Sequence, residues 1–575
     1  MALIVTKGMS VSQRSHSHPP APSFSSRSIE HNDQPVIRRN ASYHPNLWDY
    51  GSMQSLNNGF NEEDYKEELE KMKEDVKDLT KANQENPLAK LELIDAVHRL
   101  GLQYQFKAEI KHALHVIHQR AEDSRFSDDI YAIALRFRLL RQHGYHVSQD
   151  VFKGFVDETG SFRESLEENV EGLLSLYEAS FHGLKGETII DKAMEFSSTC
   201  LKALDKDKLP KRLAMKVDHA LDMPIHWRTN RLEARWFMPV YEEETSINRT
   251  LLKLAKLDYN IVQSIYMKEV SKLARWWEEL GITKLSIFRD RLLEHYLWSI
   301  LMVFEPKCET ARAITTKLGS MITMIDDVYD VYGLLEELEL LTDFVNRWDI
   351  TGIDKLPYTI KTCFLALYNT TNEIGLSVLI ERGINIIPYL RKMWADQCKA
   401  YLVEAKWYHR GLKPPTLKEY LNSAVTTVGG FLLLQCVFLA TTDTLTAETL
   451  DSISEIPRIM LSSSLIVRLS NDLGTSSHEL ARGDVLKSVE CYMNETGCSE
   501  EAARDHIKDL IRETWKNLNE DMADHYPLSE TFVGACLDLA RASQCFYQYG
   551  DGHGIPDRET KEHLNSVLIQ PVPMY

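Results

Sequence analysis

Apolar residues recur at helical spacing along most of this chain, and strand-like alternation is nearly absent. The segment Leu88–Leu100, LAKLELIDAVHRL, repeats its apolar residues three and four positions apart, and Gly101 follows as a stop signal. The connections between such segments are short and often contain Gly or Pro. We therefore predict an all-α fold.

The predicted helices fall into two groups. Those of the first half are expected at Glu63–Leu79, Leu88–Leu100, Gln105–Arg120, Asp128–His143, Glu164–Ser180, Ile189–Leu204 and Lys211–Leu221. Those of the second half are longer and more apolar, and are expected at Leu251–Gln263, Lys268–Leu280, Asp290–Val303, Cys308–Tyr332, Pro388–Tyr408, Thr416–Val425, Ile456–Asn471, Cys498–Leu518 and Ser529–Tyr549.

The helical pattern is interrupted once, near the middle of the chain. The stretch from Met223 to Arg228 breaks it, and we place a domain boundary between Tyr241 and Asn248. This gives an N-terminal helical domain over residues 38–245 and a C-terminal domain over residues 246–575. Helices that are apolar on several sides are buried, so we expect the second domain to be an α-bundle around an apolar cavity.

The first residues have a different composition. Residues 1–29 contain eight serines with Lys7, Arg14 and Arg27, and no acidic residue occurs before Glu30. A basic, Ser-rich leader without acidic residues is typical of an organelle transit peptide, which we assign to residues 1–37; a merely disordered N-terminus has the same composition. The irregular, aromatic and basic segment that follows is predicted to be a strap over the folded body.

Overall composition excludes several classes of protein. The net charge is −18, which argues against a nucleic-acid partner and means that an anionic substrate needs local cations to hold it. No run of eighteen apolar residues occurs, so we expect no membrane span. The nine cysteines are scattered without a C-x-x-C pair, which makes zinc sites and a disulfide framework improbable.

Two aspartates in the second half carry the first sign of chemistry. Asp326 and Asp330, in the motif Asp-Asp-Val-Tyr-Asp, lie four residues apart and so share one helix face. Their neighbours are largely apolar, and two carboxylates held together repel each other unless a cation such as Mg²⁺ binds between them. A charged helix end at the surface is the alternative.

A second group of oxygen-bearing side chains lies further along the chain. Asn471, Thr475 and Glu479 follow one another at i, i+4 and i+8, so amide, hydroxyl and carboxylate oxygens line one face of a helix. Together they can bind a hard cation. The alternative is a polar helix end whose Thr points to solvent or bonds back to a carbonyl.

Basic residues accompany both acidic groups. They are Arg289 and Arg291 ahead of the first motif, and Arg468 and Lys487 around the second. Each alone would be read as a solvated surface charge. Together with two metal sites they describe a clamp for a diphosphate, in which cations bridge carboxylates to phosphate oxygens and guanidinium groups bind the rest.

With these motifs the sequence resembles the plant terpene synthases, of the angiosperm monoterpene synthase type, from Arg38 to the C-terminus. The match also includes the pair Arg38-Arg39, followed by Trp48 after eight intervening residues. The resemblance implies a class I catalytic α-bundle in the second half and a helical relic domain in the first. The D-x-D-D acid of class II cyclases is absent from the sequence, so ionisation of the diphosphate is the expected initiation.

The resemblance implies a role for each site residue. Three Mg²⁺ ions, or Mn²⁺ in their place, would neutralise the diphosphate, with Asp326 and Asp330 on one side and Asn471, Thr475 and Glu479 holding the third ion. Asp327, which points about 100° away on the helix, would support these ligands. Arg289, Arg291, Arg468 and Lys487 would bind the diphosphate, and the Arg38-Arg39 strap would cap the closed site. Trp298 and Tyr547 are expected either to line the carbocation pocket or to be ordinary core.

The family context also suggests a substrate. Short-substrate isoprene synthases carry bulky phenylalanines before each metal motif, where this chain has Leu318 and Val467. We therefore expect geranyl diphosphate as substrate, a monoterpene as product, and a plastid location; farnesyl diphosphate in the cytoplasm is the alternative. We expect a monomer or a weak homodimer. Two non-catalytic alternatives are a calcium-binding helical protein and an inactive metal- and diphosphate-binding scaffold. The first gives the basic residues no role, and the second does not explain why every metal and diphosphate position carries a competent residue. The product skeleton is not predicted.

Overall fold

The computed structural model describes residues 38–82, 86–119, 128–411, 414–482, 485–523, 528–555 and 557–574. The leader, residues 1–37, lies outside these ranges. Within them the regular structure is helical, and β-pairing occurs as isolated bridges, such as the antiparallel bridge between Val156 and Phe162. The expectation of an all-α fold is confirmed.

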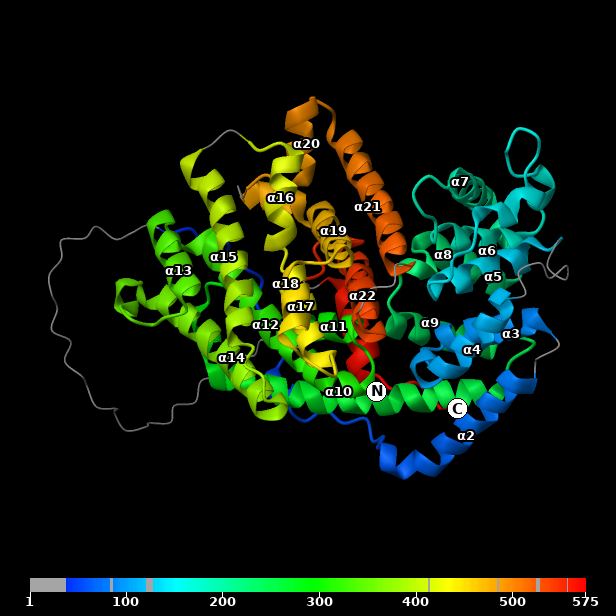
Figure 1. The fold of residues 1–575 in the computed structure, drawn as a ribbon, viewed down its shortest axis with the longest axis horizontal. Coiled ribbons are helices and arrows are strands. Elements are labelled where there is room, and N and C mark those ends of the chain that lie inside the picture. Colours follow the sequence, from blue (N-terminus) through cyan, green and yellow to red (C-terminus); the bar gives the residue numbers. More distant parts are fainter. Residues whose placement is uncertain are drawn as a thin grey trace, which may run out of the picture.

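The N-terminal helices form the right-hand body of the molecule (Figure 1). Their bounds are α2 Glu62–Ala82, α3 Pro87–Arg99, α4 Lys107–Gln119, α5 Ile130–Gln142, α6 Val170–Ser180, α7 Thr188–Ala203, α8 Lys211–Asp222 and α9 Asn230–Glu242. The helix α10, Arg249–Leu280, runs along the lower edge of the view beneath both bodies. The short helix α1, Tyr50–Met53, packs against α10 and contributes Met53 to the C-terminal core.

The C-terminal helices form the larger left-hand body, in which α11, α12, α17 and α22 lie near the middle (Figure 1). Their bounds are α11 Leu292–Met302, α12 Glu309–Asp327, α13 Leu335–Arg347, α14 Tyr358–Arg382, α15 Ile387–Arg410, α16 Leu417–Thr427, α17 Gly430–Thr441, α18 Ala447–Ser454, α19 Arg458–Arg482, α20 Ser488–Thr496, α21 Glu500–Ala523, α22 Glu530–Tyr547 and α23 Arg558–Leu564.

Helix α10 differs from its prediction, which divided it into two helices. It begins where the Asn248 side chain accepts a hydrogen bond from the Leu251 N–H, and it ends at Gly281, whose φ of 67° is left-handed. The residues between the two predicted pieces, including Ser264 and Met267, are buried against other helices and contain no Gly or Pro. Nothing there breaks the hydrogen-bond ladder, so the helix continues.

The two largest hydrophobic cores meet inside α10. Its first half, up to Ile261, packs in the N-terminal core, and its second half, from Val262, packs in the C-terminal core. The predicted boundary at Tyr241–Asn248 therefore marks the loop between α9 and α10, whereas the cores divide within a continuous helix.

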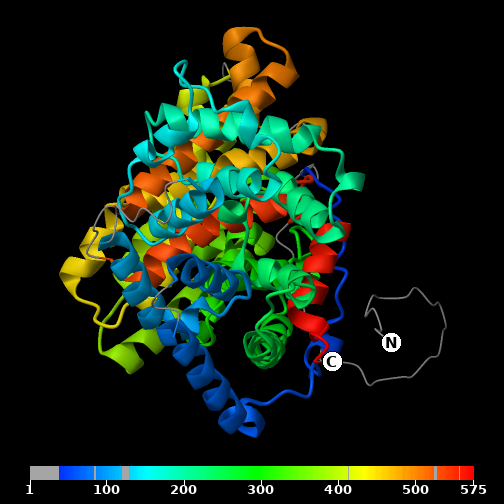
Figure 2. The same ribbon diagram turned by 90° about the vertical axis from the view of Figure 1, so that its right-hand side faces the viewer.

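The chain ends cross over between the two bodies. Trp48 and Met53, from the N-terminal strap, are buried in the C-terminal core, and Val572, near the other end, is buried in the N-terminal core. The blue N-terminal segment and the red C-terminal segment run along the same edge of the molecule (Figure 2). Each core is thus completed by residues from the opposite end of the chain.

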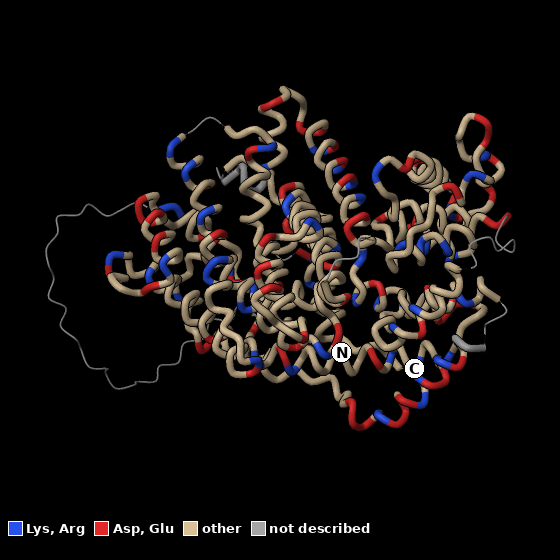
Figure 3. Tube along the Cα trace, viewed as in Figure 1, with Lys and Arg blue, Asp and Glu red and all other residues tan. Residues whose placement is uncertain are grey.

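Charged residues lie on the outer helices, whereas the most apolar helical stretch is buried. Acidic and basic residues alternate along outer helices such as α2 and α21 (Figure 3). By length and composition, the apolar stretch Leu417–Thr441 is one candidate for a membrane span, but 72% of its most apolar window is buried inside the protein. That burial is typical of a core helix.

Candidate active site

A pocket opens in the C-terminal body between α11, α12, α15, α17, α19 and α22. It encloses about 970 Å³ of space, including its open mouth. Its lining includes the predicted residues Arg289, Trp298, Asp326, Asp330, Val467, Arg468, Asn471, Lys487 and Tyr547. Residues from Arg289 to His553 thus converge on one cavity with a charged side and an apolar side.

Arg289 organises the first acidic group. Its Nη2 donates to Asp326 Oδ2 at 2.8 Å and lies 2.8 Å from Asp327 Oδ1, while its backbone N–H donates to Asp327 Oδ2 at 2.7 Å. Asp327 is only 1% exposed and does not line the pocket, so its charge orients Arg289. Burial raises the pKa of Asp326 to about 6, against the opposing effect of Arg289. A cation in the pocket would stabilise the charged form of Asp326.

Asp330 lies in a different kind of helix from Asp326. The α-helix α12 ends at Asp327, and Val328–Tyr332 continue it as a single π-helical turn, which the sequence did not predict. Such turns are rare and often occur at functional sites. Even with this wider turn, both carboxylates line the pocket.

The Arg38-Arg39 strap is attached to this turn. Arg39 Nη1 donates to the Asp330 carbonyl oxygen at 2.9 Å, and Arg38 Nη1 donates to that of Tyr332 at 3.2 Å. Arg38 also makes two 2.7 Å hydrogen bonds to the Glu337 carboxylate. Further along the strap, Trp48 Nε1 donates to Glu294 Oε1 at 3.0 Å. The strap therefore holds the backbone of the turn that carries Asp330.

This attachment can be tested by amide hydrogen exchange. We expect Glu337→Gln to raise the exchange rates over residues 42–50 and 328–333 by about tenfold, because the charged, bidentate pair with Arg38 is lost. The neighbouring exposed carboxylate gives a matched control, Glu336→Gln, which should leave these rates unchanged. Equal exchange in the Glu337→Gln variant and the wild type would show that the strap is held by other contacts.

The second acidic group is built around Arg468. Its Nη2 lies 2.6 Å from Asp472 Oδ1 and also donates to Asn471 Oδ1. Asp472, which the sequence analysis missed, is fully buried and accepts hydrogen bonds from Tyr420 Oη and from the Ser488 N–H, each at 3.1 Å. The sequence signal that could have identified Asp472 is its position directly after Asn471. Asp472 fixes the direction of Arg468 much as Asp327 fixes Arg289.

The other members of this group lie along α19. Thr475 is 2% exposed, and its Oγ1 is buried and makes no hydrogen bond to any described residue. Glu479 belongs to the same helix, which extends eleven residues beyond the predicted end at Asn471, but the position of its side chain lies outside the described part of the structure. A buried hydroxyl without a hydrogen-bond partner among the described residues, one helical turn from Asn471, is suited to bind a hard cation.

Lys487 faces a carboxylate that the sequence analysis did not single out. Lys487 Nζ lies 3.8 Å from Glu404 Oε2, and Thr427 Oγ1 donates to Glu404 Oε1 at 2.7 Å. Glu404 is 2% exposed and lines the pocket from α15. No local pattern distinguishes it from the other glutamates of the chain.

Arg291 is placed differently from its prediction. It is 1% exposed and does not line the pocket. Its Nη2 donates to the carbonyl oxygens of Gly554 and His44 and its Nη1 to that of Asp290, all at 2.8 Å. In this structure Arg291 therefore joins the N-terminal strap to the loop after α22, and its contact with the diphosphate stays a prediction.

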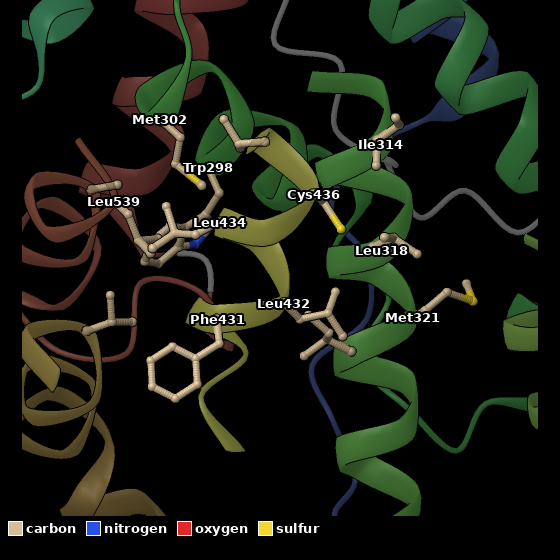
Figure 4. Close-up of a cluster of buried hydrophobic side chains, with 14 of the residues drawn as sticks. Trp298, Met302, Ile314, Leu318, Met321, Phe431, Leu432, Leu434, Cys436 and Leu539 are labelled. Carbon is tan, nitrogen blue, oxygen red and sulfur yellow. The ribbon is translucent and has the colours of Figure 1, made fainter. Parts of the chain in front are cut away.

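The apolar side of the pocket contains both predicted aromatic residues. Trp298 stacks on Phe546 at a centroid distance of 4.6 Å, and Tyr547 lies 6.1 Å from Trp298. Trp298, Met302 and Leu539 gather on one side of α17, while Leu318 and Met321 belong to α12 on the other (Figure 4). Leu318 is fully buried and does not line the pocket, so the size argument that used it does not apply; Val467 does line it.

Two histidines also line the pocket and were not predicted. The rings of His295 and His553 lie 4.8 Å apart, and His295 Nε2 lies 2.9 Å from Thr323 Oγ1. Burial lowers the pKa of His295 to about 3, and burial together with His295 and Arg289 lowers that of His553 well below its usual value. Both rings are therefore neutral.

Neither histidine nor any other side chain of the described residues forms a group of three or more His, Cys, Asp or Glu residues around one point. The potential metal ligands are instead the carboxylates of Asp326 and Asp330 and the mixed amide and hydroxyl oxygens of Asn471 and Thr475. These are oxygen donors, which suit a hard divalent cation.

Comparison with known proteins identifies this architecture. Residues 278–517 match the model of the terpene synthase family, metal binding domain, and residues 47–221 match that of the terpene synthase, N-terminal domain. The chain is 48% identical to a (−)-alpha-terpineol synthase of Vitis vinifera over 94% of this chain and 91% of the other. It is equally identical, over 94% of both chains, to a beta-bisabolene synthase of Santalum austrocaledonicum.

Comparison with solved structures points to the same family. A limonene synthase crystallised with 2-fluorolinalyl diphosphate superposes with a TM-score of 0.90 at 38% identity, covering 93% of this chain and 100% of that one. The isoprene synthase of grey poplar leaves, in complex with three Mg²⁺ ions and dimethylallyl-S-thiolodiphosphate, superposes with a TM-score of 0.85 at 42% identity, covering 92% and 99%. The chain therefore belongs to the terpene synthase family and is a lyase that acts on a prenyl diphosphate, with a domain that binds divalent metal.

Proposed function

We propose that this enzyme is a monoterpene synthase that ionises geranyl diphosphate in the presence of Mg²⁺ and releases a monoterpene and diphosphate. The observation that carries the proposal is the two-sided pocket. Its charged side holds Arg289, Asp326, Asp330, Arg468 and Lys487, and its other side is aromatic and aliphatic. A diphosphate fits the first and a C10 hydrocarbon chain the second.

The residues present fit divalent metal, and we propose that they hold three Mg²⁺ ions. The carboxylates of Asp326 and Asp330 face the cavity, and the buried Thr475 hydroxyl next to Asn471 has no hydrogen-bond partner among the described residues. When bound, Mg²⁺ neutralises the charge of the diphosphate and makes it a better leaving group. Glu479 is proposed as a further ligand from its position on α19.

The protein's own residues supply binding, orientation and a dry site. Arg289, Arg468 and Lys487 bind the diphosphate oxygens, and Asp327 and Asp472 hold the two arginines in place. Departure of the diphosphate leaves an allylic carbocation. The face of Trp298, stacked on Phe546, stabilises positive charge, and the aliphatic residues keep bulk water away. The neutral His295 and His553 can take up the proton that ends the reaction.

Farnesyl diphosphate is the second candidate substrate. It is favoured by the beta-bisabolene synthase relative, which is as similar to this chain as the alpha-terpineol synthase is. The composition of residues 1–37 supports geranyl diphosphate, because we propose that this leader directs the enzyme to plastids.

The substrate is tested by kinetics. With the full-length chain and Mg²⁺, we expect kcat/KM for geranyl diphosphate to exceed that for farnesyl diphosphate by about tenfold or more, because Met302, Leu433 and Leu539 limit the apolar side. Diphosphate release measures both rates, and gas chromatography identifies the products. A higher kcat/KM for farnesyl diphosphate would make the enzyme a sesquiterpene synthase.

A further inference from the structure

Three hydroxyl groups meet at the wall of the pocket, between α11 and α12. Ser299 Oγ lies 2.8 Å from Thr316 Oγ1, and Thr315 Oγ1 lies 2.9 Å from Ser299 Oγ. Ser299 and Thr315 line the cavity, whereas Thr316 is fully buried behind them. Next to them the lining is apolar, with Met302 on the same helix as Ser299. We refer to Ser299, Thr315 and Thr316 as the hydroxyl cluster.

The hydroxyl cluster has too few hydrogen atoms for its contacts. Besides the two contacts between hydroxyls, Ser299 reaches the His295 carbonyl at 3.0 Å, Thr316 reaches that of Arg312 at 2.7 Å, and Thr315 reaches those of Ala311 and Arg312 at 2.7 and 3.1 Å. Each hydroxyl has one hydrogen and two acceptor lone pairs. Three hydrogens thus face six contacts, and at most two of the six lone pairs accept a hydrogen from within the cluster. The remaining lone pairs can accept a hydrogen bond from a ligand that donates one, such as an O–H group.

The same contacts have a purely structural explanation, which covers only part of them. Ser and Thr in helices commonly bond back to the carbonyl four residues earlier, as all three do here. That accounts for the bonds to the helix backbone. It does not account for two hydroxyls that face a cavity in which a carbocation has to survive, because Ala and Val at these positions would pack the helices equally well and present no lone pairs.

We propose that Ser299 and Thr315 bind the water molecule that adds to the carbocation, so that the main product is a terpene alcohol. This inference rests on the proposed function. A water that donates its two hydrogens to Ser299 Oγ and Thr315 Oγ1 keeps its oxygen lone pair directed to the cavity. The apolar lining next to the hydroxyl cluster keeps bulk solvent away from the carbocation, so that a bound water is the one that reacts.

The step is balanced without any further reagent. The water oxygen uses a lone pair to form a C–O bond with the cationic carbon, which gives an oxonium ion. One O–H bond of the oxonium then breaks, and its proton passes to a neutral imidazole of the His295 and His553 pair. His295 lies one helical turn from Ser299 on α11. The products are an alcohol and an imidazolium, and nothing is oxidised or reduced.

The experiment compares product ratios in isotopic water. The full-length enzyme is incubated with Mg²⁺ and geranyl diphosphate in H₂¹⁸O, and the volatiles are identified by gas chromatography and mass spectrometry. We expect an ¹⁸O-labelled alcohol as the main product of the wild type. Thr315→Val, which keeps the shape, and Ser299→Ala are each expected to raise the ratio of hydrocarbon to alcohol by about tenfold, since one hydrogen bond to the water is lost.

The controls separate this effect from a change in rate or folding. The ratio of hydrocarbon to alcohol does not depend on the rate of turnover, so a slow variant with unchanged product chemistry gives the same value as a fast one. Thr315→Ser retains a hydroxyl and should keep the ratio within about twofold of the wild type. If Thr315→Val fails to fold, Ser299→Ala alone decides the result.

Each outcome counts for or against the inference. A wild type that turns geranyl diphosphate into hydrocarbons alone overturns it and leaves the proposed function intact. A labelled alcohol whose share is the same in both variants also overturns it, because the water is then held elsewhere. If only farnesyl diphosphate is consumed, the monoterpene proposal fails, and the same ratios with that substrate decide the inference. If neither substrate is consumed, both proposals fall.

Discussion

Asp326→Asn is expected to lower kcat/KM for the prenyl diphosphate by about 10³-fold at a fixed Mg²⁺ concentration. The substitution keeps the size of the side chain and its hydrogen bond from Arg289, and removes only the negative charge that faces the cavity. Without that charge, the pocket loses one of the two carboxylates that we propose bind metal. The measurement is diphosphate release over a range of Mg²⁺ concentrations, with the loss largest at low Mg²⁺.

A loss of activity could also come from unfolding of the variant or from the mere removal of a carboxylate, and each of these explanations can be tested. Burial raises the pKa of Asp326, which means that the fold disfavours its charged form, so Asp326→Asn should melt at the same temperature as the wild type or higher. The matched control is Asp343→Asn on α13, which removes an exposed carboxylate paired with Arg347 and should keep full activity. More than a tenth of wild-type activity in the Asp326→Asn variant would exclude a metal-binding role for Asp326.

The second large effect concerns stability. Arg312→Met is expected to lower the free energy of unfolding by about 3–5 kcal/mol, because it leaves the Glu269 carboxylate buried without its countercharge. The Arg312 side chain is fully buried, donates to both oxygens of Glu269 at 2.8 and 2.6 Å, and donates to the carbonyl oxygens of Val303 and Glu305. This pair joins α10 to α12, the helix that carries Asp326.

Urea unfolding of the C-terminal core measures this effect. The double variant Arg312→Met/Glu269→Met should recover most of the loss, because an apolar pair is often as stable as a buried ion pair. The surface control Arg347→Met breaks an exposed pair with Asp343 and should cost less than about 1 kcal/mol. A loss below 1 kcal/mol in Arg312→Met would mean that solvent reaches Glu269 despite its burial.

Local patterns in the sequence predicted most of the architecture. Helical spacing located α3, α7 and α8 to within two residues, since the signal that buries one face of a helix is contained in that helix. It divided α10 in two at residues 264–267, although no Gly or Pro interrupts the helix there, and the burial of Ser264 and Met267 became visible only in the folded structure. The π-turn at Asp330 has no sequence signal of this kind.

The site was predicted as far as its motifs are contiguous. Asp326, Asp330, Arg468 and Asn471 follow from short spacings, and all line the pocket. Arg291 has the same local signature as Arg289, yet packing directs it to the Gly554 and His44 carbonyls. Glu404 and the His295–His553 pair reach the pocket only through the contacts of α11 and α15 with distant segments. No local sequence pattern predicts that these residues line the pocket.

The crossing of the chain ends over the two cores sets an order for the protein's synthesis. Trp48 and Met53 leave the ribosome first, but the C-terminal core that buries them extends to Leu568. At about 5–20 residues per second, these two apolar side chains wait tens of seconds for their partners, a period in which a chaperone can bind them. Expression of either half alone would also leave a hole in its core, so a functional two-piece version of this enzyme has to exchange the terminal segments between the pieces.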